Sequence, residues 1–188
     1  MSRAAPRLGI TGSAGTGKTT LAAAVACRLA VPVLPEAMRA LLEQGFDLHS
    51  LSRDQHRDLL CRQADALACD LARIDGGLVS DRTPLDMAAF WLSNGYGVDD
   101  PAATEALLAR AIMALADYSH IVLLPWGAMP LAADGVRSPN PWLQLHFQTI
   151  IEGLCRRWVE PARLIALPET AMAPEARCAF VLERLAAD

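Results

Sequence analysis

The stretch Gly12–Thr19 reads GSAGTGKT and matches the phosphate-binding pattern G-x-x-x-x-G-K-[S/T] at every fixed position. An apolar segment, Leu8–Thr11, precedes it, and an amphipathic segment, Lys18–Leu29, follows it. Glycines let the backbone curl so that successive N–H groups point at phosphate oxygens, and the N-terminus of a following helix favours anions. The pattern therefore predicts a strand, a phosphate-binding loop (P-loop) and a helix that together hold a nucleoside triphosphate.

Individual residues of this loop have distinct expected contacts with the nucleotide, which we expect to be ATP. The Lys18 ammonium reaches the β- and γ-phosphates, and the Thr19 hydroxyl binds Mg²⁺. Lys18 is also the single lysine among 17 basic residues, and the planar guanidinium of arginine does not replace a compact ammonium at this position. The residues expected to contact ATP are Gly12, Ser13, Ala14, Gly15, Thr16, Gly17, Lys18, Thr19 and Thr20.

Short apolar segments alternate with longer amphipathic ones along the whole chain, which is typical of βαβ units around a parallel sheet. We predict one α/β domain over residues 1–188, with the three-layer P-loop NTPase fold: a five-stranded parallel sheet flanked by helices. The expected strands are Leu8–Thr11, Val31–Leu34, Leu78–Ser80, Ile121–Leu124 and Leu164–Leu167. The expected helices are Lys18–Leu29, Ala37–Gln44, 53–74, Pro84–Leu92, Pro101–Ala116, 143–158 and Pro174–Leu185, with an irregular loop at Gly127–Pro141.

Composition and charge exclude several classes of protein. With 188 residues and 53% hydrophobic side chains, the chain can bury a full core, so it is not disordered. No apolar run approaches the roughly 18 residues of a membrane-spanning helix, so we expect no membrane partner. The net charge of −4 argues against a nucleic-acid partner, which needs clustered cations. Five cysteines without disulfide-scaffold spacing favour free thiols, and hence a cytoplasmic protein. The sequence does not fix the oligomeric state, and a homodimer stays open.

Three charged residues outside the loop are candidates for catalysis. Glu36 follows the second predicted strand and Asp81-Arg82 follows the third, and open α/β sheets bind ligands at these strand ends. Either carboxylate can act as the base, Asp81 can also bind Mg²⁺, and Arg82 can clamp an anionic oxygen. Structural interpretations stay open beside these: a strand-end or capping carboxylate for Asp81, a salt bridge to a neighbouring helix for Arg82, and a helix-dipole contact for Glu36.

Other residues carry weaker signals. Asp86, one helical turn after Arg82, either faces an acceptor hydroxyl or lies on a helix surface. Gln55 and Gln63 on the long helix can read the edge of a base. Trp91 and Tyr96 either line the substrate side or pack in the core.

The triplet Asp81-Arg82-Thr83 resembles the acid-Arg-Ser/Thr triplet that nucleoside and nucleotide kinases place at the end of the third strand. Glu36, in PEAMR, lies where those kinases have a carboxylate near the acceptor. Arg137, in DGVR, follows the fourth strand, where their arginine-bearing lid lies. The chain thus resembles the small AAA-type kinase-like ATPases that include the ribosylnicotinamide kinase domain. The resemblance implies a lid around 127–141 in which Arg137 closes over the phosphoryl group, although nucleotide kinases often carry several arginines there.

These observations favour an ATP- and Mg²⁺-dependent phosphotransferase acting on a small molecule with a hydroxyl group, a nucleoside-like acceptor being favoured. A GTP-dependent switch is disfavoured, because such proteins usually read guanine with an Asn-Lys-x-Asp motif and this chain has no second lysine. Two alternatives stay open. One is a regulatory ATP-binding module that controls a partner, and the other is an antibiotic or secondary-metabolite kinase.

Overall fold

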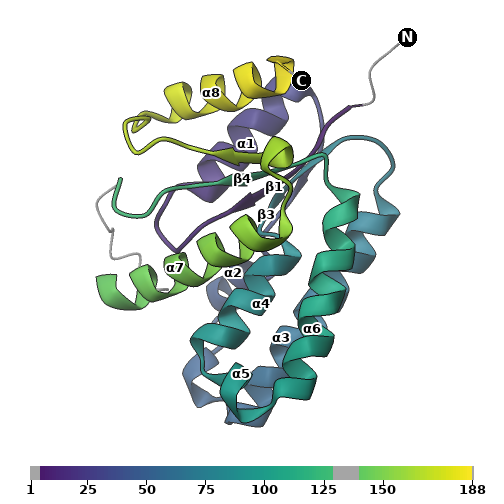
Figure 1. Cartoon of the computed structure of the whole chain (residues 1–188), viewed down its shortest axis with the longest axis vertical. Coiled ribbons are helices and arrows are strands. Elements are labelled where there is room, and N and C mark those ends of the chain that lie inside the picture. The colour runs from purple at the N-terminus through teal and green to yellow at the C-terminus, as the bar shows by residue number, and fades with distance from the viewer. Residues whose placement is uncertain (1–4, 129–139, 188) are drawn as a thin grey trace.

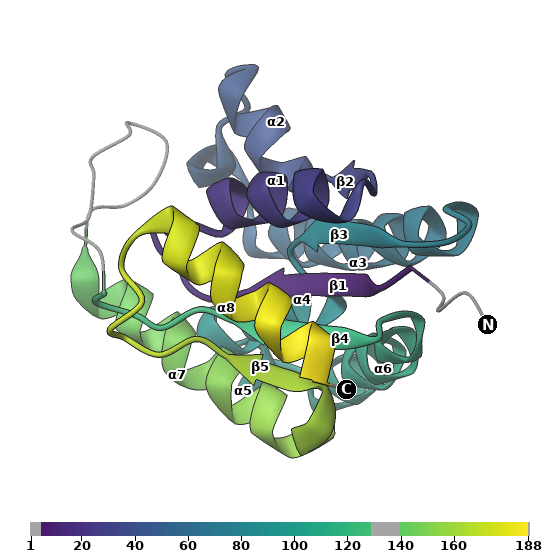
Figure 2. The same ribbon diagram turned by 90° about the horizontal axis from the view of Figure 1, so that it is seen from above.

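The computed structural model describes residues 5–128 and 140–187, and the five predicted strands form one parallel sheet within them. The strands lie in the order β2-β3-β1-β4-β5, so the chain begins in the middle of the sheet and builds out one side and then the other (Figure 2). The strands are β1 Arg7–Thr11, β2 Val33–Leu34, β3 Leu78–Asp81, β4 His120–Leu123 and β5 Leu164–Ala166.

The predicted helices are confirmed, with ends that differ by a few residues. They are α1 Lys18–Leu29, α2 Ala37–Glu43, α3 Arg53–Arg73, α4 Pro84–Ser93, α6 Pro101–Ala114, α7 Pro141–Trp158 and α8 Pro174–Ala187. Four shorter elements were not predicted, because three or four residues are too few to show a helical period. They are α5 Tyr96–Asp99 and the 3₁₀ turns η1 Leu48–Ser50, η2 Leu115–Asp117 and η3 Pro161–Arg163.

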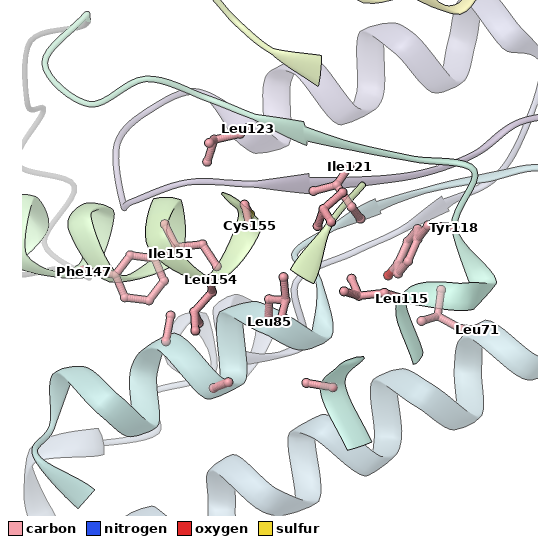
Figure 3. Packing of buried hydrophobic residues seen from close by; sticks show 14 of the residues in the cluster. Leu71, Leu85, Leu115, Tyr118, Ile121, Leu123, Phe147, Ile151, Leu154 and Cys155 are labelled. Carbon is pink, nitrogen blue, oxygen red and sulfur yellow. The ribbon is translucent and has the colours of Figure 1, made fainter. Parts of the chain in front are cut away.

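The helices cover both faces of the sheet, which gives the predicted three layers (Figure 1). Helices α1 and α8 pack on one face against Leu8, Ile10 and Val122. Helices α3, α4, α6 and α7 cover the other face, where Ile121 and Ile151 belong to a second buried cluster (Figure 3). The fold is therefore the α/β P-loop NTPase fold.

The strand register decides which side chains face the P-loop helix. Ile10 is paired with Asp81 and with Val122, and partners in a parallel sheet point to the same face. Ile10 and Val122 belong to the cluster under α1, so Asp81 faces α1 as well. Thr11 is paired with Leu123, whose face is covered by α4. The end of β1 and β3 can thus hold polar groups on both sides of the sheet.

Two predicted segments differ from the structure or lie outside it. The second strand begins at Val33, because Ala30 takes a left-handed conformation at the end of α1 and Val31 still donates its N–H to the Ala26 carbonyl. Residues 129–139, which include Arg137 and most of the predicted lid, lie outside the described residues.

The remaining expectations concern the cysteines and the membrane. All five cysteines fall within the described residues, and all are free thiols, with Cys155 and Cys178 buried. Within the described ranges, no helix combines the length and the apolar character that crossing a bilayer requires.

Candidate active site

The loop between β1 and α1 has the backbone shape that a phosphate site requires. Gly12, Gly15 and Gly17 have φ values of 137°, 75° and 87°, which side-chain-bearing residues rarely adopt. At Gly12 an added Cβ would also lie 3.0 Å from the Leu124 carbonyl oxygen at the end of β4. Glycine is therefore required at Gly12 both for its conformation and for its close contact with the neighbouring strand.

The main-chain N–H groups of this loop are arranged for an anion. Those of Ala14, Gly15 and Gly17 have no hydrogen-bond partner among the described residues. The Ser13 N–H, by contrast, donates to Gln148 Oε1 at 2.8 Å, which ties the start of the loop to α7. The loop is thus anchored at one end and offers N–H donors at the other, next to the N-terminus of α1.

Lys18 lies inside the loop. Its side chain is 3% exposed, and Nζ donates to the Ser13 carbonyl at 2.6 Å. The Thr16 hydroxyl donates to the same carbonyl at 2.9 Å. The ammonium is therefore already held at the mouth of the loop, close to where phosphate oxygens would lie.

Thr19 and Asp81, predicted to bind Mg²⁺, contact each other. The Thr19 hydroxyl donates to Asp81 Oδ2 at 2.6 Å. Asp81 is 3% exposed, and its other oxygen, Oδ1, is buried without a hydrogen-bond partner in the described part of the chain. A buried carboxylate oxygen without a donor can bind a cation, and Mg²⁺ prefers carboxylate and hydroxyl oxygens. The residues present therefore fit Mg²⁺.

Arg82 joins the P-loop to two carboxylates. Its guanidinium donates to Glu36 Oε1 at 3.0 Å, to Asp86 Oδ1 at 2.8 Å and to the Gly12 carbonyl at 3.1 Å. Burial by itself lowers the pKa of Arg82, but the carboxylates of Glu36, Asp86 and Asp81 outweigh it and raise the pKa above its ordinary value. Arg82 forms the salt bridge that its structural interpretation expected, and it also reaches the P-loop.

The backbone of Arg82 is strained. Its φ of 107° lies in a region that favours glycine, and such a conformation costs about 1–3 kcal/mol. The main-chain N–H donates to the Ile10 carbonyl at 3.0 Å, and the carbonyl accepts from the Ser80 hydroxyl at 2.7 Å. These bonds and the three side-chain partners together hold the unfavourable conformation, which turns the guanidinium toward the loop.

Glu36 and Asp86 occupy different positions around Arg82. Glu36 is the N-cap residue of α2, but its side chain caps no helical N–H and contacts Arg82 instead. Asp86 is fully buried, so it does not lie on a helix surface. Its Oδ2 accepts hydrogen bonds from the Thr11 hydroxyl and from both the N–H and the hydroxyl of Thr83. Asp86 therefore orients Arg82 and completes the capping box at the start of α4. Glu36 lies at the edge of a cavity.

The cavity, of ≈ 830 Å³, lies between α2, the segment 45–52, α3, α4 and the start of α7. Ala14, Glu36, Asp81 and Arg82 line it beside the P-loop. Most of its other walls are apolar, with contributions from Leu34, Met38, Leu42, Phe46, Leu60, Leu67, Met87, Phe90, Leu143 and Phe147. A mostly apolar cavity with a few polar groups at one end is the usual form of a small-molecule site.

The weaker candidates fall into two groups. Gln63 lines the cavity, and its Nε2 is buried without a partner in the described ranges. Tyr96 also lines the cavity, whereas Trp91 packs in a buried cluster beside it. Gln55 instead completes the capping box of α3 with Ser52, and Thr20 is exposed on the first turn of α1.

The sequence did not identify two buried polar residues that support the loop. The Gln148 amide accepts from Ser13 and donates to the Leu124 carbonyl and to Glu152. Arg177 of α8, 2% exposed, donates to the Thr16 carbonyl at 2.6 Å and to the Ala171 carbonyl at 2.7 Å. A glutamine or an arginine on the buried face of a predicted helix was the available signal, because buried polar groups require partners.

Comparison with known proteins identifies the family of this chain. A family model described as an AAA domain matches residues 7–173. The curated protein named "Putative adenylate kinase" from Natronomonas pharaonis is 41% identical over 73 residues, a stretch that spans 39% of this chain and 40% of that protein.

Several solved structures share the fold at low sequence identity. Deoxyadenosine kinase from M. mycoides superposes with a TM-score of 0.64 and 14% identity, over 97% of this chain and all of that one. The NadR protein in complex with NAD and AMP-PNP superposes with a TM-score of 0.68 and 16% sequence identity, over 98% of this chain and 50% of that one. Shikimate kinase from Acinetobacter baumannii superposes with a TM-score of 0.62 and 15% sequence identity, over 97% of this chain and 94% of that one. Because the family model covers nearly the whole chain, and P-loop kinases share its fold, the protein belongs to this AAA-domain family of P-loop proteins.

Proposed function

We propose that the protein transfers the γ-phosphoryl group of ATP to a hydroxyl of a small molecule, with a nucleoside-like acceptor favoured. The observation that carries this proposal is the shared wall between the P-loop and the cavity. Ala14, Asp81, Arg82 and Glu36 all line the cavity, so a molecule bound there would lie next to the γ-phosphate. Hydrolysis of ATP alone would not require such a cavity.

The donor side of the reaction falls to the P-loop. Its N–H groups and Lys18 would bind the β- and γ-phosphates, because they form a positive cradle around the loop. Thr19 and Asp81 would hold Mg²⁺, which offsets charge on the phosphate oxygens when it is bound. Arg137, outside the described residues, stays a candidate for a lid residue that closes over the phosphoryl group.

Glu36 and Arg82 would act on the acceptor side of the reaction, where the hydroxyl attacks. The acceptor oxygen attacks the γ-phosphorus, its proton passes to Glu36, and the bond from phosphorus to the β–γ bridging oxygen breaks to release ADP. We favour Glu36 as the base, because Asp81, which contacts the Thr19 hydroxyl, would be bound to Mg²⁺. Arg82 would hold Glu36 in place and stabilise negative charge at the phosphoryl group.

The shape and the apolar lining of the cavity favour an acceptor that carries a ring, rather than a small polyol. Its apolar walls would bind a ring such as a base, and the buried Gln63 Nε2 offers a donor to the edge of that ring. Likeness in fold to deoxyadenosine kinase is consistent with a nucleoside, although shikimate kinase has the same fold.

The test is ADP release measured with a panel of nucleosides, sugars, polyols and aminoglycoside or polyketide alcohols. The proposal predicts that at least one hydroxyl acceptor accelerates ADP release, and that its analogue without the hydroxyl does not. Slow release that no acceptor changes would instead support a regulatory ATP-binding module. A preference for the antibiotic alcohols would assign the same chemistry to a secondary-metabolite kinase.

A further inference from the structure

The cavity has a second polar end, far from the P-loop. His56, Ser93, Asn94 and Tyr96 line it there, on α3, at the end of α4 and on α5. Helix α4 begins two residues after Arg82 and is 10 residues long, so its far end lies about 15 Å from the phosphate side. The apolar walls described above lie between the two ends. Gln63, two turns after His56 on α3, also lines the cavity and is a polar group in this stretch. The cavity therefore matches a molecule with polar groups at both ends and a mostly apolar middle.

His56 is held in a fixed orientation at this end. Its Nδ1 lies 2.8 Å from the Tyr96 hydroxyl, and the two rings meet edge to face with centroids 5.8 Å apart. The guanidinium of Arg53 lies over the Tyr96 ring, 4.8 Å from its centroid, and the Trp91 ring packs against Tyr96 from another side. Because Tyr96 is buried among these groups, it fixes the plane of the imidazole.

The second imidazole nitrogen has no partner in the part of the chain that the structure describes. His56 Nε2 makes no hydrogen bond with any residue in the described ranges, and His56 faces the cavity. The neighbouring side chains of Ser93 and Asn94 each donate one hydrogen bond to the Phe90 carbonyl, at 3.0 and 2.8 Å, which ties both to the end of α4. His56 Nε2 is thus a group at this end, fixed in orientation by Tyr96, that can form a hydrogen bond with a molecule in the cavity.

This end of the cavity carries little net charge. Arg53 is paired with Asp99 and Arg57 with Asp100, so the cations on α3 are neutralised by acids at and after α5. Burial lowers the pKa of His56, which keeps the imidazole neutral at neutral pH. A neutral imidazole next to paired charges suits an uncharged hydrogen-bonding group rather than a phosphate or a carboxylate.

We infer that the acceptor is a two-ended, uncharged molecule, with its reacting hydroxyl at Glu36 and Arg82 and a second hydrogen-bonding group on its ring bound by His56 Nε2. This inference rests on the proposed function, because it assigns the substrate class of the same cavity. His56 is then a specificity-determining residue, and Tyr96 is the positioning residue that orients it. An acceptor without the second polar group would leave Nε2 without a partner and would bind more weakly.

In the experiment, each variant is assayed with each of a set of matched acceptors. Adenosine and cytidine are compared with a phenyl riboside, which keeps the sugar hydroxyls and a ring joined through carbon but has no polar ring atom, and with methyl riboside, which has no such ring. The variants are His56→Ala and Tyr96→Phe. Asp58→Ala is the control, because Asp58 is exposed on α3 and does not line the cavity. Steady-state kcat and KM are measured for each pair, with thermal melting of every variant.

The expected result is a KM effect that depends on the acceptor. His56→Ala should raise the KM for the better nucleoside about tenfold, the value of one lost hydrogen bond, with kcat within twofold. The KM for the phenyl riboside should not change. Tyr96→Phe should act in the same direction by about threefold, and it carries the test by itself if His56→Ala does not fold. Asp58→Ala should match the wild type.

Two results would overturn the inference while the proposed function stands. One is an equal KM change for the nucleoside and the phenyl riboside in His56→Ala, and the other is a wild-type preference for methyl riboside or a polyol over both nucleosides. If no acceptor accelerates ADP release by the wild type, the proposed function itself fails and the inference fails with it.

Discussion

The two ends of the candidate active site are built in different ways. The phosphate end is the P-loop, which is made by eight consecutive residues and mostly by main chain, with glycines where the backbone must curl and with Lys18 and Thr19 as the side chains proposed to contact phosphate and Mg²⁺. The acceptor end is made by side chains from α2, α3, α4, α5 and α7, which span more than 100 residues of sequence. A main-chain site therefore leaves a compact sequence motif, whereas a side-chain site depends on the folded arrangement and can change its substrate by substitution.

Lys18→Ala should have the largest effect, because it removes the ammonium of the phosphate end without changing the acceptor end. We expect transfer to fall by about 10³-fold or more, in line with other cations that act on a transferring phosphoryl group. The measurement is kcat at saturating acceptor, with thermal melting as a check on folding. Lys18→Arg is the matched control and should not restore activity, since the planar fork does not fit where the ammonium lies. Substantial activity in Lys18→Arg would contradict this account of the loop.

Asp81→Asn and Glu36→Gln compare two carboxylates at the boundary between the ends. Each keeps the shape of the side chain and removes its charge. Asp81→Asn should raise the Mg²⁺ concentration needed for half-maximal activity, because the buried Oδ1 would no longer attract a cation. Glu36→Gln should lower kcat about 10²-fold at saturating Mg²⁺, the usual contribution of a general base. An exchange of these two phenotypes would make Asp81 the base and Glu36 the metal carboxylate.

Arg177 tests whether the phosphate end depends on support from α8. Arg177→Met removes the hydrogen bonds to the Thr16 and Ala171 carbonyls. The free energy of unfolding should therefore fall by about 2 kcal/mol, and the KM for ATP should rise about tenfold. Arg177→Lys should restore part of both losses. The acceptor KM should stay the same. Denaturant unfolding and ATP titration measure the two effects, and an unchanged KM for ATP would reduce Arg177 to a purely stabilising residue.

The strained backbone of Arg82 predicts the smallest effect. Arg82→Ala and Arg82→Gly lose the same ion pairs to Glu36 and Asp86, and they differ only in how well the backbone tolerates a φ of 107°. Arg82→Gly should therefore be more stable than Arg82→Ala by about 1 kcal/mol. Chemical denaturation of the two variants measures this difference. Equal stability, or a more stable alanine variant, would show that the conformation carries no strain.

The same contrast explains how much the sequence could predict. The strands, the main helices and the P-loop followed from periodicity and one motif, and the meeting of Glu36, Asp81 and Arg82 followed from the rule that parallel strands end at one edge. The roles of Gln148 and Arg177 depend on contacts across 135 and 161 residues of chain, which no local pattern reveals. The pairing of His56 with Tyr96 likewise needs α5, a helix of one turn that has no clear sequence signal.

The most direct test of the account follows the γ-phosphoryl group itself. The protein is incubated with γ-labelled ATP, Mg²⁺ and the best acceptor of the panel, and the products are separated by chromatography. The account predicts that the label appears on the acceptor in a one-to-one ratio with ADP, and that Lys18→Ala yields neither product. Label recovered only as inorganic phosphate, at a rate that the acceptor does not change, would contradict it.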